Sequence, residues 1–296
     1  MENWVTVAAF ILCIAVLAAL IVLIEGRREL HSFRVTHYNV GNKMFHNLDS
    51  EKKIVFLTDL HCKVYGDHNA PLLDAIRLEK PDLILVGGDM LIGKKTAVTG
   101  PALDFVTRLP DICPVYYCNG NHEERLLEDP ARYGSSYHDY RKALIESGIH
   151  LLANESEELW MDRLKIQLTG LELPVEAYER GGQKLLLEKG IDCFVKKPLK
   201  DRYHLLLAHD PSHMKLYKEW GADMILSGHL HGGIIRIPGI GGLITPRWKF
   251  FPKYSGEMTV EGETTIIVSR GLGTHTVNLR FCNPAEVVVI HLKPQK

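Results

Sequence analysis

The sequence has no cysteine pattern that indicates a disulfide framework or a zinc-thiolate structural site. Its six cysteines are scattered, and no two of them form a Cys-x-x-Cys pair. Scattered free thiols are typical of a reducing compartment. A small fold stapled by disulfides is therefore excluded as an interpretation of this chain.

The sequence also lacks an excess of charge of either sign. Lys and Arg total 35 and Asp and Glu total 36 among 296 residues, and no internal repeat, low-complexity tract or long charge run is present. Because a nucleic-acid-binding surface usually brings a strong positive balance, nucleic acid is not an expected partner. The composition, 46% hydrophobic and 24% charged, is that of a globular protein. The roughly 260 residues after the N-terminal segment suffice for one large α/β domain.

One long hydrophobic run is present, from Trp4 to Ile24. As a helix it would span about 30 Å, the thickness of the hydrocarbon core of a bilayer. The alternative is a cleaved signal peptide. Against that alternative, no Lys or Arg precedes the run, the run exceeds a signal h-region, and no small-residue cleavage site follows it. We therefore predict a transmembrane anchor in residues 1–26, with residues 4–24 in the membrane.

The charges that flank this run predict its orientation. Arg27, Arg28 and Arg34 follow the run, and no basic side chain precedes it. The positive-inside rule then predicts a single-pass protein of the cell membrane with its folded domain in the cytoplasm. Residues 27–50 are expected to form a juxtamembrane segment and a first strand, and residues 51–296 the folded domain.

Five apolar runs each end in residues that carry oxygen or imidazole donors. Such short, nearly all-apolar runs are typical of strands covered on both faces, and the segments between them, such as Pro71–Glu79, favour helices. The runs and their donors are 54–57 with Asp59 and His61, 82–86 with Asp89, 114–118 with Asn121 and His122, 203–208 with His209, and 222–226 with His229 and His231.

Alternating strands and helices predict an α/β fold with a parallel sheet, whose ligands gather beyond the carboxyl ends of the strands. The donors should thus meet at one rim. They are too many for one ion, and a carboxylate such as Asp89 can bridge two ions about 3.5 to 4 Å apart. Imidazole, carboxylate and amide oxygen without thiolate suit manganese, iron, zinc or cobalt. Two divalent ions are therefore the predicted cofactors, with manganese as the first choice.

These motifs, read together, resemble those of a known family. Asp59-x-His61, Gly88-Asp89, Gly120-Asn121-His122-Glu123, His209 and Gly228-His229-x-His231 are similar in order and spacing to the motifs of the calcineurin-like metallophosphoesterases. The anchor and the stretches 228–233, 252–254 and 269–273 resemble the bacterial transmembrane branch of that superfamily.

The resemblance implies a particular fold for the chain. That fold is a four-layer α/β/β/α sandwich, formed by residues 51–296 as a metallophosphoesterase domain behind one N-terminal transmembrane helix. Leu164–Leu168, Thr264–Ser269 and Val287–Leu292 would then supply much of the second sheet.

The resemblance also implies roles for the site residues. Asp59, His61, Asp89 and His231 would hold the first ion, and Asp89, Asn121, His209 and His229 the second, with Asp89 shared. His122 would then be the catalytic histidine that faces the leaving group rather than a ligand. Many members carry an aspartate three residues after the bridging one, which orients this histidine, and here that position is Ile92.

The chemistry that follows is phosphoester hydrolysis. Two cations would lower the pKa of a bridging water, so that hydroxide attacks phosphorus in line while His122 offsets charge on the leaving oxygen. The predicted activity is that of a phosphodiesterase or pyrophosphatase. Part of the branch is similar to enzymes that hydrolyse UDP-2,3-diacylglucosamine, so a lipid-linked substrate is one expectation. The alternatives are a general phosphomonoesterase or nucleotide phosphodiesterase and, in another class, a non-catalytic metal-binding scaffold.

Two further residues are candidates for substrate binding. His275 lies in a late loop that could reach the rim of the pocket. Arg247 lies in the segment 234–251, where apolar and aromatic residues alternate with basic ones, as in surfaces that meet anionic lipid headgroups. The alternative is an ordered loop packed on the sheet.

Overall fold

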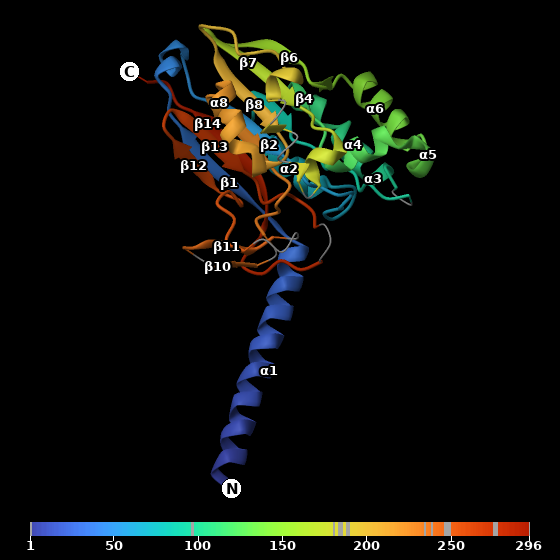
Figure 1. Cartoon of the computed structure of the whole chain (residues 1–296), viewed down its shortest axis with the longest axis vertical. Coiled ribbons are helices and arrows are strands. Elements are labelled where there is room, and N and C mark those ends of the chain that lie inside the picture. Colours follow the sequence, from blue (N-terminus) through green and yellow to red (C-terminus); the bar gives the residue numbers. More distant parts are fainter. Residues whose placement is uncertain are drawn as a thin grey trace.

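The computed structural model describes residues 2–95, 98–179, 181–182, 186–187, 190–233, 235–237, 239–245, 250–274 and 278–295. Arg247 and His275, the two candidates for substrate binding, lie outside these residues. The described chain forms a folded body from which helix α1 (Glu2–Leu30) projects as a single rod (Figure 1).

The first sheet contains six strands, in the order β1, β14, β2, β3, β4, β5. Their bounds are β1 Phe33–Val40, β14 Ala285–Leu292, β2 Lys52–Leu57, β3 Leu83–Val86, β4 Val115–Tyr117 and β5 His150–Leu151. Strands β2, β3 and β4 are parallel, as their apolar runs predict. Strand β1 lies at the edge of the sheet and pairs in parallel with β14.

The second sheet also contains six strands, in the order β12, β13, β9, β8, β7, β6. Their bounds are β12 Met258–Glu261, β13 Thr264–Val268, β9 Met224–Ser227, β8 Tyr203–Ala208, β7 Leu164–Leu171 and β6 Ser156–Met161. A separate hairpin pairs β10 (Ile235–Ile237) with β11 (Gly241–Ile244). The five donor-bearing strands are therefore divided between two sheets rather than joined in one parallel sheet.

One assignment to the second sheet was wrong. Segments 164–168 and 264–268 lie there, but Val287–Leu292 belongs to β14, which runs antiparallel to β2 inside the first sheet. Residues 287–290 are fully buried. An all-apolar pattern predicts a strand covered on both faces, and both sheets offer such a position, so the pattern cannot choose the sheet.

Alternate side chains of the buried strands build separate layers. Ile54 and Phe56 of β2 face the second sheet, where they pack with residues such as Leu207. Val55 and Leu57 point the other way, against the helices α2 (Ala70–Glu79), α3 (Gly100–Val106) and α6 (Ser136–Glu146). Each such aliphatic side chain contributes about 1.5 to 3 kcal/mol by burial.

Helix α8 (Met214–Trp220) covers the outer face of the second sheet. The layers are thus helix, sheet, sheet and helix, which confirms the predicted fold. Other helices within the described residues are α4 (Asn121–Glu128) and α5 (Pro130–Tyr133), with the 3-10 helices η1 (Lys43–Asn47), η2 (Leu109–Asp111), η3 (Val175–Tyr178), η4 (Ile191–Cys193) and η5 (Pro211–His213).

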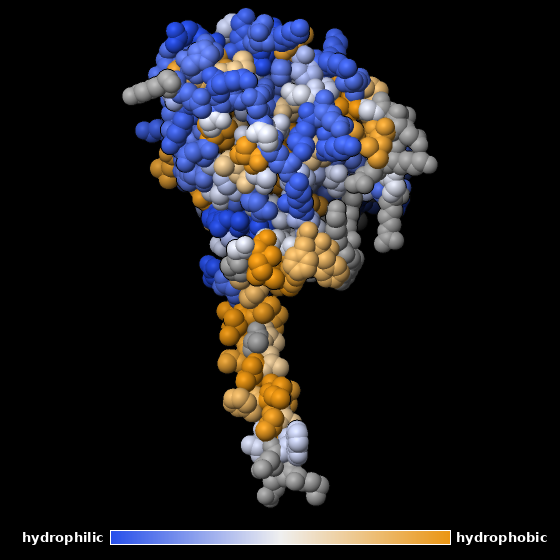
Figure 2. All heavy atoms as spheres, turned by 60° about the vertical axis from the view of Figure 1, so that its left-hand side comes forward, coloured by the Kyte–Doolittle hydropathy of each residue, from blue (hydrophilic) through white to orange (hydrophobic). Residues whose placement is uncertain are grey.

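Helix α1 is apolar along most of the rod that projects from the domain (Figure 2). Residues Trp4–Leu30 are long and apolar enough to cross a membrane, and none of the most apolar window is buried. A signal sequence near an N-terminus meets the same criterion.

Candidate metal centre

The predicted donors from both sheets lie close together in one largely buried region. Within the described residues, His and Asp side chains form three groups whose ligand atoms lie within 4.8 Å of one another. The groups are Asp59 with His61 and His231, His61 with Asp89 and His122, and Asp89 with His209 and His229.

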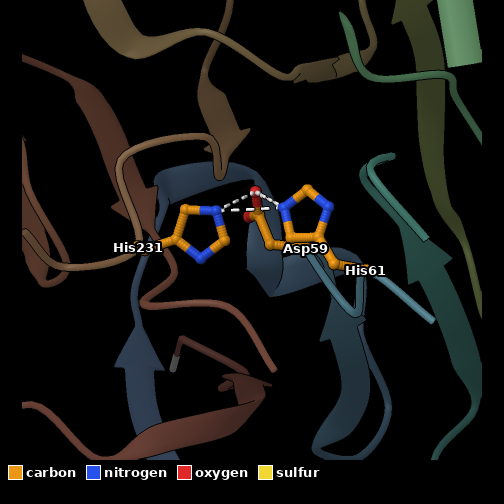
Figure 3. Close-up of side chains that lie close together, drawn as sticks. All are labelled: Asp59, His61 and His231. Carbon is orange, nitrogen blue, oxygen red and sulfur yellow. Dashed lines mark hydrogen bonds and ion pairs between the residues drawn. The ribbon is translucent and has the colours of Figure 1, made fainter. Parts of the chain in front are cut away.

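The first group combines the ends of β2 and β9. His231 Nε2 lies 3.3 Å from Asp59 Oδ1, and the Nε2 atoms of His61 and His231 are only 3.1 Å apart. Figure 3 shows the two imidazoles approaching the carboxylate from opposite sides, each with a nitrogen directed at it. Two ring nitrogens at this distance favour a cation or a proton between them, because their lone pairs would otherwise repel.

The third group, Asp89 with His209 and His229, brings together the loops after β3, β8 and β9. Asp89 Oδ2 lies 3.0 Å from His209 Nε2 and 3.9 Å from His61 Nε2, so Asp89 stands between the two groups. Asn121 lies in the first turn of α4, and its buried Oδ1 has no hydrogen-bond partner among the described residues. An unsatisfied buried carbonyl oxygen is costly unless something else coordinates it, which fits a metal ligand.

The backbone fixes which nitrogen each of three imidazoles presents. The Nδ1 atoms of His61, His209 and His231 lie 3.1, 2.7 and 3.2 Å from the carbonyl oxygens of Leu91, Gly87 and Gly273. A carbonyl only accepts, so each Nδ1 donates its proton and leaves the Nε2 lone pair directed at the centre. This is how metal-binding histidines are usually oriented.

His122 has the opposite arrangement. The backbone N–H of Gly93 donates to His122 Nδ1 at 2.6 Å, so that Nδ1 accepts and the neutral ring carries its proton on Nε2. That Nε2 is buried and lies 3.9 Å from Asp89 Oδ2. His122 therefore presents a proton to the centre, whereas His61, His209 and His231 present lone pairs.

Comparison with known proteins agrees with this geometry. The profile of the calcineurin-like phosphoesterases matches residues 52–233, more than half of the chain. The chain belongs to the calcineurin-like phosphoesterase family. Its membership and the clustered His and Asp side chains together identify a metal-dependent phosphoesterase, and they confirm the resemblance seen in the motifs.

Curated relatives cover most of the chain. Phosphodiesterase YaeI of Escherichia coli (strain K12) is 29% identical over 247 residues, which cover 81% of this chain and 82% of YaeI. The uncharacterized metallophosphoesterase YkuE of Bacillus subtilis (strain 168) is 29% identical over 272 residues, which cover 90% and 87%. The solved structure of phosphopantetheinyl hydrolase (PptH) from Mycobacterium tuberculosis has a TM-score of 0.44 and 16% identity, covering 79% of this chain and 96% of that one.

Glu123 organises this phosphoesterase centre without facing the metal position. Its buried carboxylate accepts the backbone N–H groups of Asp89 at 2.8 Å, Leu91 at 2.9 Å and Gly120 at 3.1 Å, and the hydroxyl of Tyr117 at 3.1 Å. It thereby ties the loop after β3 to the start of α4. Glu123 belongs to the Gly120-Asn121-His122-Glu123 motif, and an acidic third residue of a helix is a capping signal in the sequence.

Several site residues have a left-handed backbone. The φ angles of Asp59, His61, Asp89, His229 and His231 are +54°, +49°, +53°, +68° and +50°. Non-glycine residues rarely adopt this conformation, and such strain gathers at functional sites. Close approach adds to it, since a Cβ on Gly228 would lie 2.2 Å from Asp59 Oδ2. The conformation of these loops is therefore set by the position of the carboxylates, at the cost of unfavourable backbone angles.

The buried carboxylates and imidazoles of the centre shift one another's pKa values. Burial raises the pKa of Asp59 to about 6, against the opposing charge of His209. Burial and the neighbouring Asp89 raise the pKa of Glu123 to about 7. Burial alone would lower the pKa of His209, but Asp89 and Asp59 outweigh it and raise that pKa to about 10. The metal-free centre therefore retains protons, which divalent ions would have to displace.

A small pocket lies beside Leu230. It has a volume of about 160 Å³, and Leu230, which separates His229 from His231, forms part of its wall. Pro211, Pro252 and Tyr254 supply apolar walls, and Lys253 supplies a positive charge.

Proposed function

We propose that this chain is a dinuclear-metal phosphohydrolase that cleaves a phosphodiester or pyrophosphate bond. In this proposal Asp59, His61, Asp89 and His231 hold one ion and Asp89, Asn121, His209 and His229 hold the other. One observation carries it: loops from both sheets bring two adjoining groups of donors together, with the lone pairs of His61 and His231 near Asp59 and that of His209 near Asp89.

When bound, two divalent ions would supply Lewis acidity and a water activated for attack on phosphorus. The residues of the chain orient the ligands and bind the substrate. Carbonyls hold the ligand rings in the metal-binding tautomer, and Glu123 fixes the loop that carries Asp89. His122 donates a hydrogen bond from Nε2 to an oxygen of the phosphate or the leaving group. In this neutral tautomer His122 acts by hydrogen bonding and needs no carboxylate behind it, which fits Ile92 at the position where the family resemblance implies an aspartate.

The reaction class is tested by substrate preference. Full-length protein, loaded with Mn²⁺, is assayed on bis-p-nitrophenyl phosphate, p-nitrophenyl phosphate and a UDP-linked lipid. The proposal predicts turnover of the diester or the pyrophosphate above that of the monoester. Monoester turnover alone would favour a phosphomonoesterase. Absence of all turnover, with two ions bound, would favour a non-catalytic scaffold.

Support for a diester or pyrophosphate substrate comes from two sources. A diester carries a second group beyond the reacting phosphate, and the pocket beside Leu230 offers a place for one. YaeI, the relative described above, is named a phosphodiesterase. A lipid-linked substrate is the finer part of the proposal, and it depends on how the domain meets the membrane.

We further propose that α1 anchors the chain, with the domain in the cytoplasm, and that an apolar surface beside α1 rests on the bilayer. Ile240 at the tip of the β10–β11 hairpin, Phe250 and Phe251 are 68%, 63% and 60% exposed. The hairpin lies at the end of the domain from which α1 departs, and apolar atoms gather there next to the helix (Figures 1 and 2). Exposed aromatic and aliphatic side chains in this place suit the membrane interface.

The membrane surface is tested without the anchor. A chain that lacks residues 1–24 but keeps the end of α1 should bind anionic vesicles, and Ile240→Glu with Phe251→Glu should abolish that binding. Trp160→Glu is the control, because Trp160 is 56% exposed on β6 at the far end of the domain. Equal binding by both variants would contradict an interfacial surface.

A further inference from the structure

The last turn of α1 is built into the folded domain. Glu29 is only 3% exposed, and its Oε2 accepts the backbone N–H of Asn283 at 2.8 Å. Gly26 lies against Leu279, where a Cβ would come within 2.7 Å of the Leu279 side chain. Lys63 donates from Nζ to the carbonyl oxygen of Leu30. The helix is therefore held by specific contacts where it enters the domain, rather than joined to it by a free linker.

Asn283 connects this turn to a candidate metal ligand. Its side chain is fully buried, and Nδ2 donates to the carbonyl oxygens of His231 at 2.7 Å and Gly233 at 2.6 Å. The backbone N–H of the same residue is the one bound by Glu29. Two hydrogen bonds thus separate the Glu29 carboxylate from the backbone of His231.

The ring of His231 depends on the same segment of chain. Its Nδ1 donates to the carbonyl oxygen of Gly273 at 3.2 Å, and the buried Arg280 also donates to that oxygen, at 2.5 Å. Arg280 also donates to the carbonyl oxygen of Asn283 at 3.1 Å. The segment that Glu29 holds in place therefore fixes both the backbone and the tautomer of His231.

The contact through Lys63 reaches a second ligand of the same proposed ion. Lys63 lies two residues after His61, in the loop that follows β2. Within the described chain, the hydrogen bonds that α1 makes to the folded domain go to Asn283 and Lys63. Both lead to the first group of ligands, and neither leads to Asn121 or His209.

We propose that the end of α1 is part of the scaffold of one metal position, with Glu29 and Asn283 as positioning residues for His231. This inference rests on the proposed function, because it requires His231 to be a metal ligand. Loss of such an outer partner typically weakens metal binding about 10- to 100-fold. The effect is selective: the ion at Asp59, His61 and His231 depends on the docked helix, and the ion at Asn121, His209 and His229 does not.

The experiment titrates Mn²⁺ into full-length protein in nanodiscs and follows electron paramagnetic resonance. A single bound ion and a spin-coupled pair give different spectra, so the two binding events are separated. Glu29→Ala should raise the Mn²⁺ concentration needed for the coupled pair about tenfold and leave the first binding event unchanged. Glu29→Gln should stay close to wild type, because its side-chain carbonyl can still accept from Asn283.

The matched control is Glu25→Ala, one turn earlier on α1, where the carboxylate pairs only with Arg28 within the described residues. It should bind both ions as wild type does. The inference is wrong if Glu29→Ala forms the pair normally, if it weakens both ions equally, or if Glu29→Gln behaves like Glu29→Ala. Should Glu29→Ala not fold, Asn283→Asp tests the same link, since it keeps the N–H to Glu29 and loses the donors to His231.

A further variant separates this inference from the proposed function. If His231→Ala still forms the coupled pair, His231 is not a ligand and the proposed set of ligands is wrong. If His231→Ala loses the pair while Glu29→Ala and Asn283→Asp keep it, the metal centre stands and only the role of the helix is wrong.

Discussion

Four imidazoles of the centre differ in which ring nitrogen carries the proton. Carbonyl oxygens behind His61, His209 and His231 place the proton on Nδ1, whereas the Gly93 N–H behind His122 places it on Nε2. The first three can give a lone pair to a metal, and His122 can give a hydrogen bond to substrate. The division of roles expected from the motifs thus has a physical basis in the backbone.

Substitution of His122 tests that division. His122→Ala should lower kcat about 100-fold, the usual cost of losing one hydrogen-bond donor to developing charge, and should leave two ions bound. His122→Gln, which keeps an N–H donor, should recover part of the activity. Kinetic assays with metal analysis check this. Loss of an ion from His122→Ala would show that His122 is a ligand instead.

The pKa shifts predict how the metal-free protein responds to pH. The raised pKa values of Asp59 and Glu123 mean that folding favours their protonated forms, so the free energy of unfolding falls as the pH rises from about 4 to about 7. His209 acts in the same direction, because the stability from its raised pKa is lost as the pH rises towards 10. Asp89, whose pKa is lowered, acts only below its ordinary range.

Thermal melts of chelator-treated protein at several pH values check this. The melting temperature should be higher at pH 5 than at pH 8, and Asp59→Asn should reduce the difference. With Mn²⁺ present the trend should reverse, because the ions take the place of the protons. A melting temperature that rises with pH in the metal-free protein would contradict the assignment.

At the residue scale, the sequence predicted the donors but not what holds them. Asp, His and Asn at the ends of apolar runs are visible in the sequence because strand ends are where ligands gather. The tautomers and the contacts of Glu123 depend on carbonyls and N–H groups from distant loops, which no local pattern encodes. The role of Asn283 could not be predicted for the same reason, since its partners Glu29 and His231 are far away in the chain.

At the scale of the elements, the start of α4 is held in place by one side chain. Glu123 lies in its first turn and accepts hydrogen bonds from four donors, three of them backbone N–H groups. Glu123→Ala would leave these donors unsatisfied in the interior and should lower the free energy of unfolding by about 3 kcal/mol or more. Glu146→Ala, with a 65% exposed side chain on α6, is the control and should change little. Denaturant titration measures both, and equal effects would contradict the role of Glu123.

Local apolarity predicts buried strands but not how those strands pair. Local apolarity predicted β2, β3, β4, β8 and β9, because each is buried on both faces. It could not predict that β14 inserts between β1 and β2, since that pairing joins the two ends of the folded domain. Which sheet a buried strand joins is decided by long-range packing.

At the scale of the whole molecule, two halves of a sandwich meet at a charged centre. Asp59, Asp89 and Glu123 are buried together, and like charges in one interior repel. Metal ions should therefore stabilise the folded protein. At Mn²⁺ concentrations about 100-fold above the dissociation constant the gain is about 2.7 kcal/mol for each site. Calorimetry with and without chelator checks this, and an unchanged melting temperature would contradict it.

The most direct test of the paired-ion centre is the metal content of the purified full-length protein. Elemental analysis after equilibration with Mn²⁺ and removal of free ions should give two ions per chain for wild type. Asp89→Asn should retain at most one tightly bound ion, because Asp89 is shared. One ion or none in wild type, or two ions in Asp89→Asn, would contradict a centre bridged by Asp89.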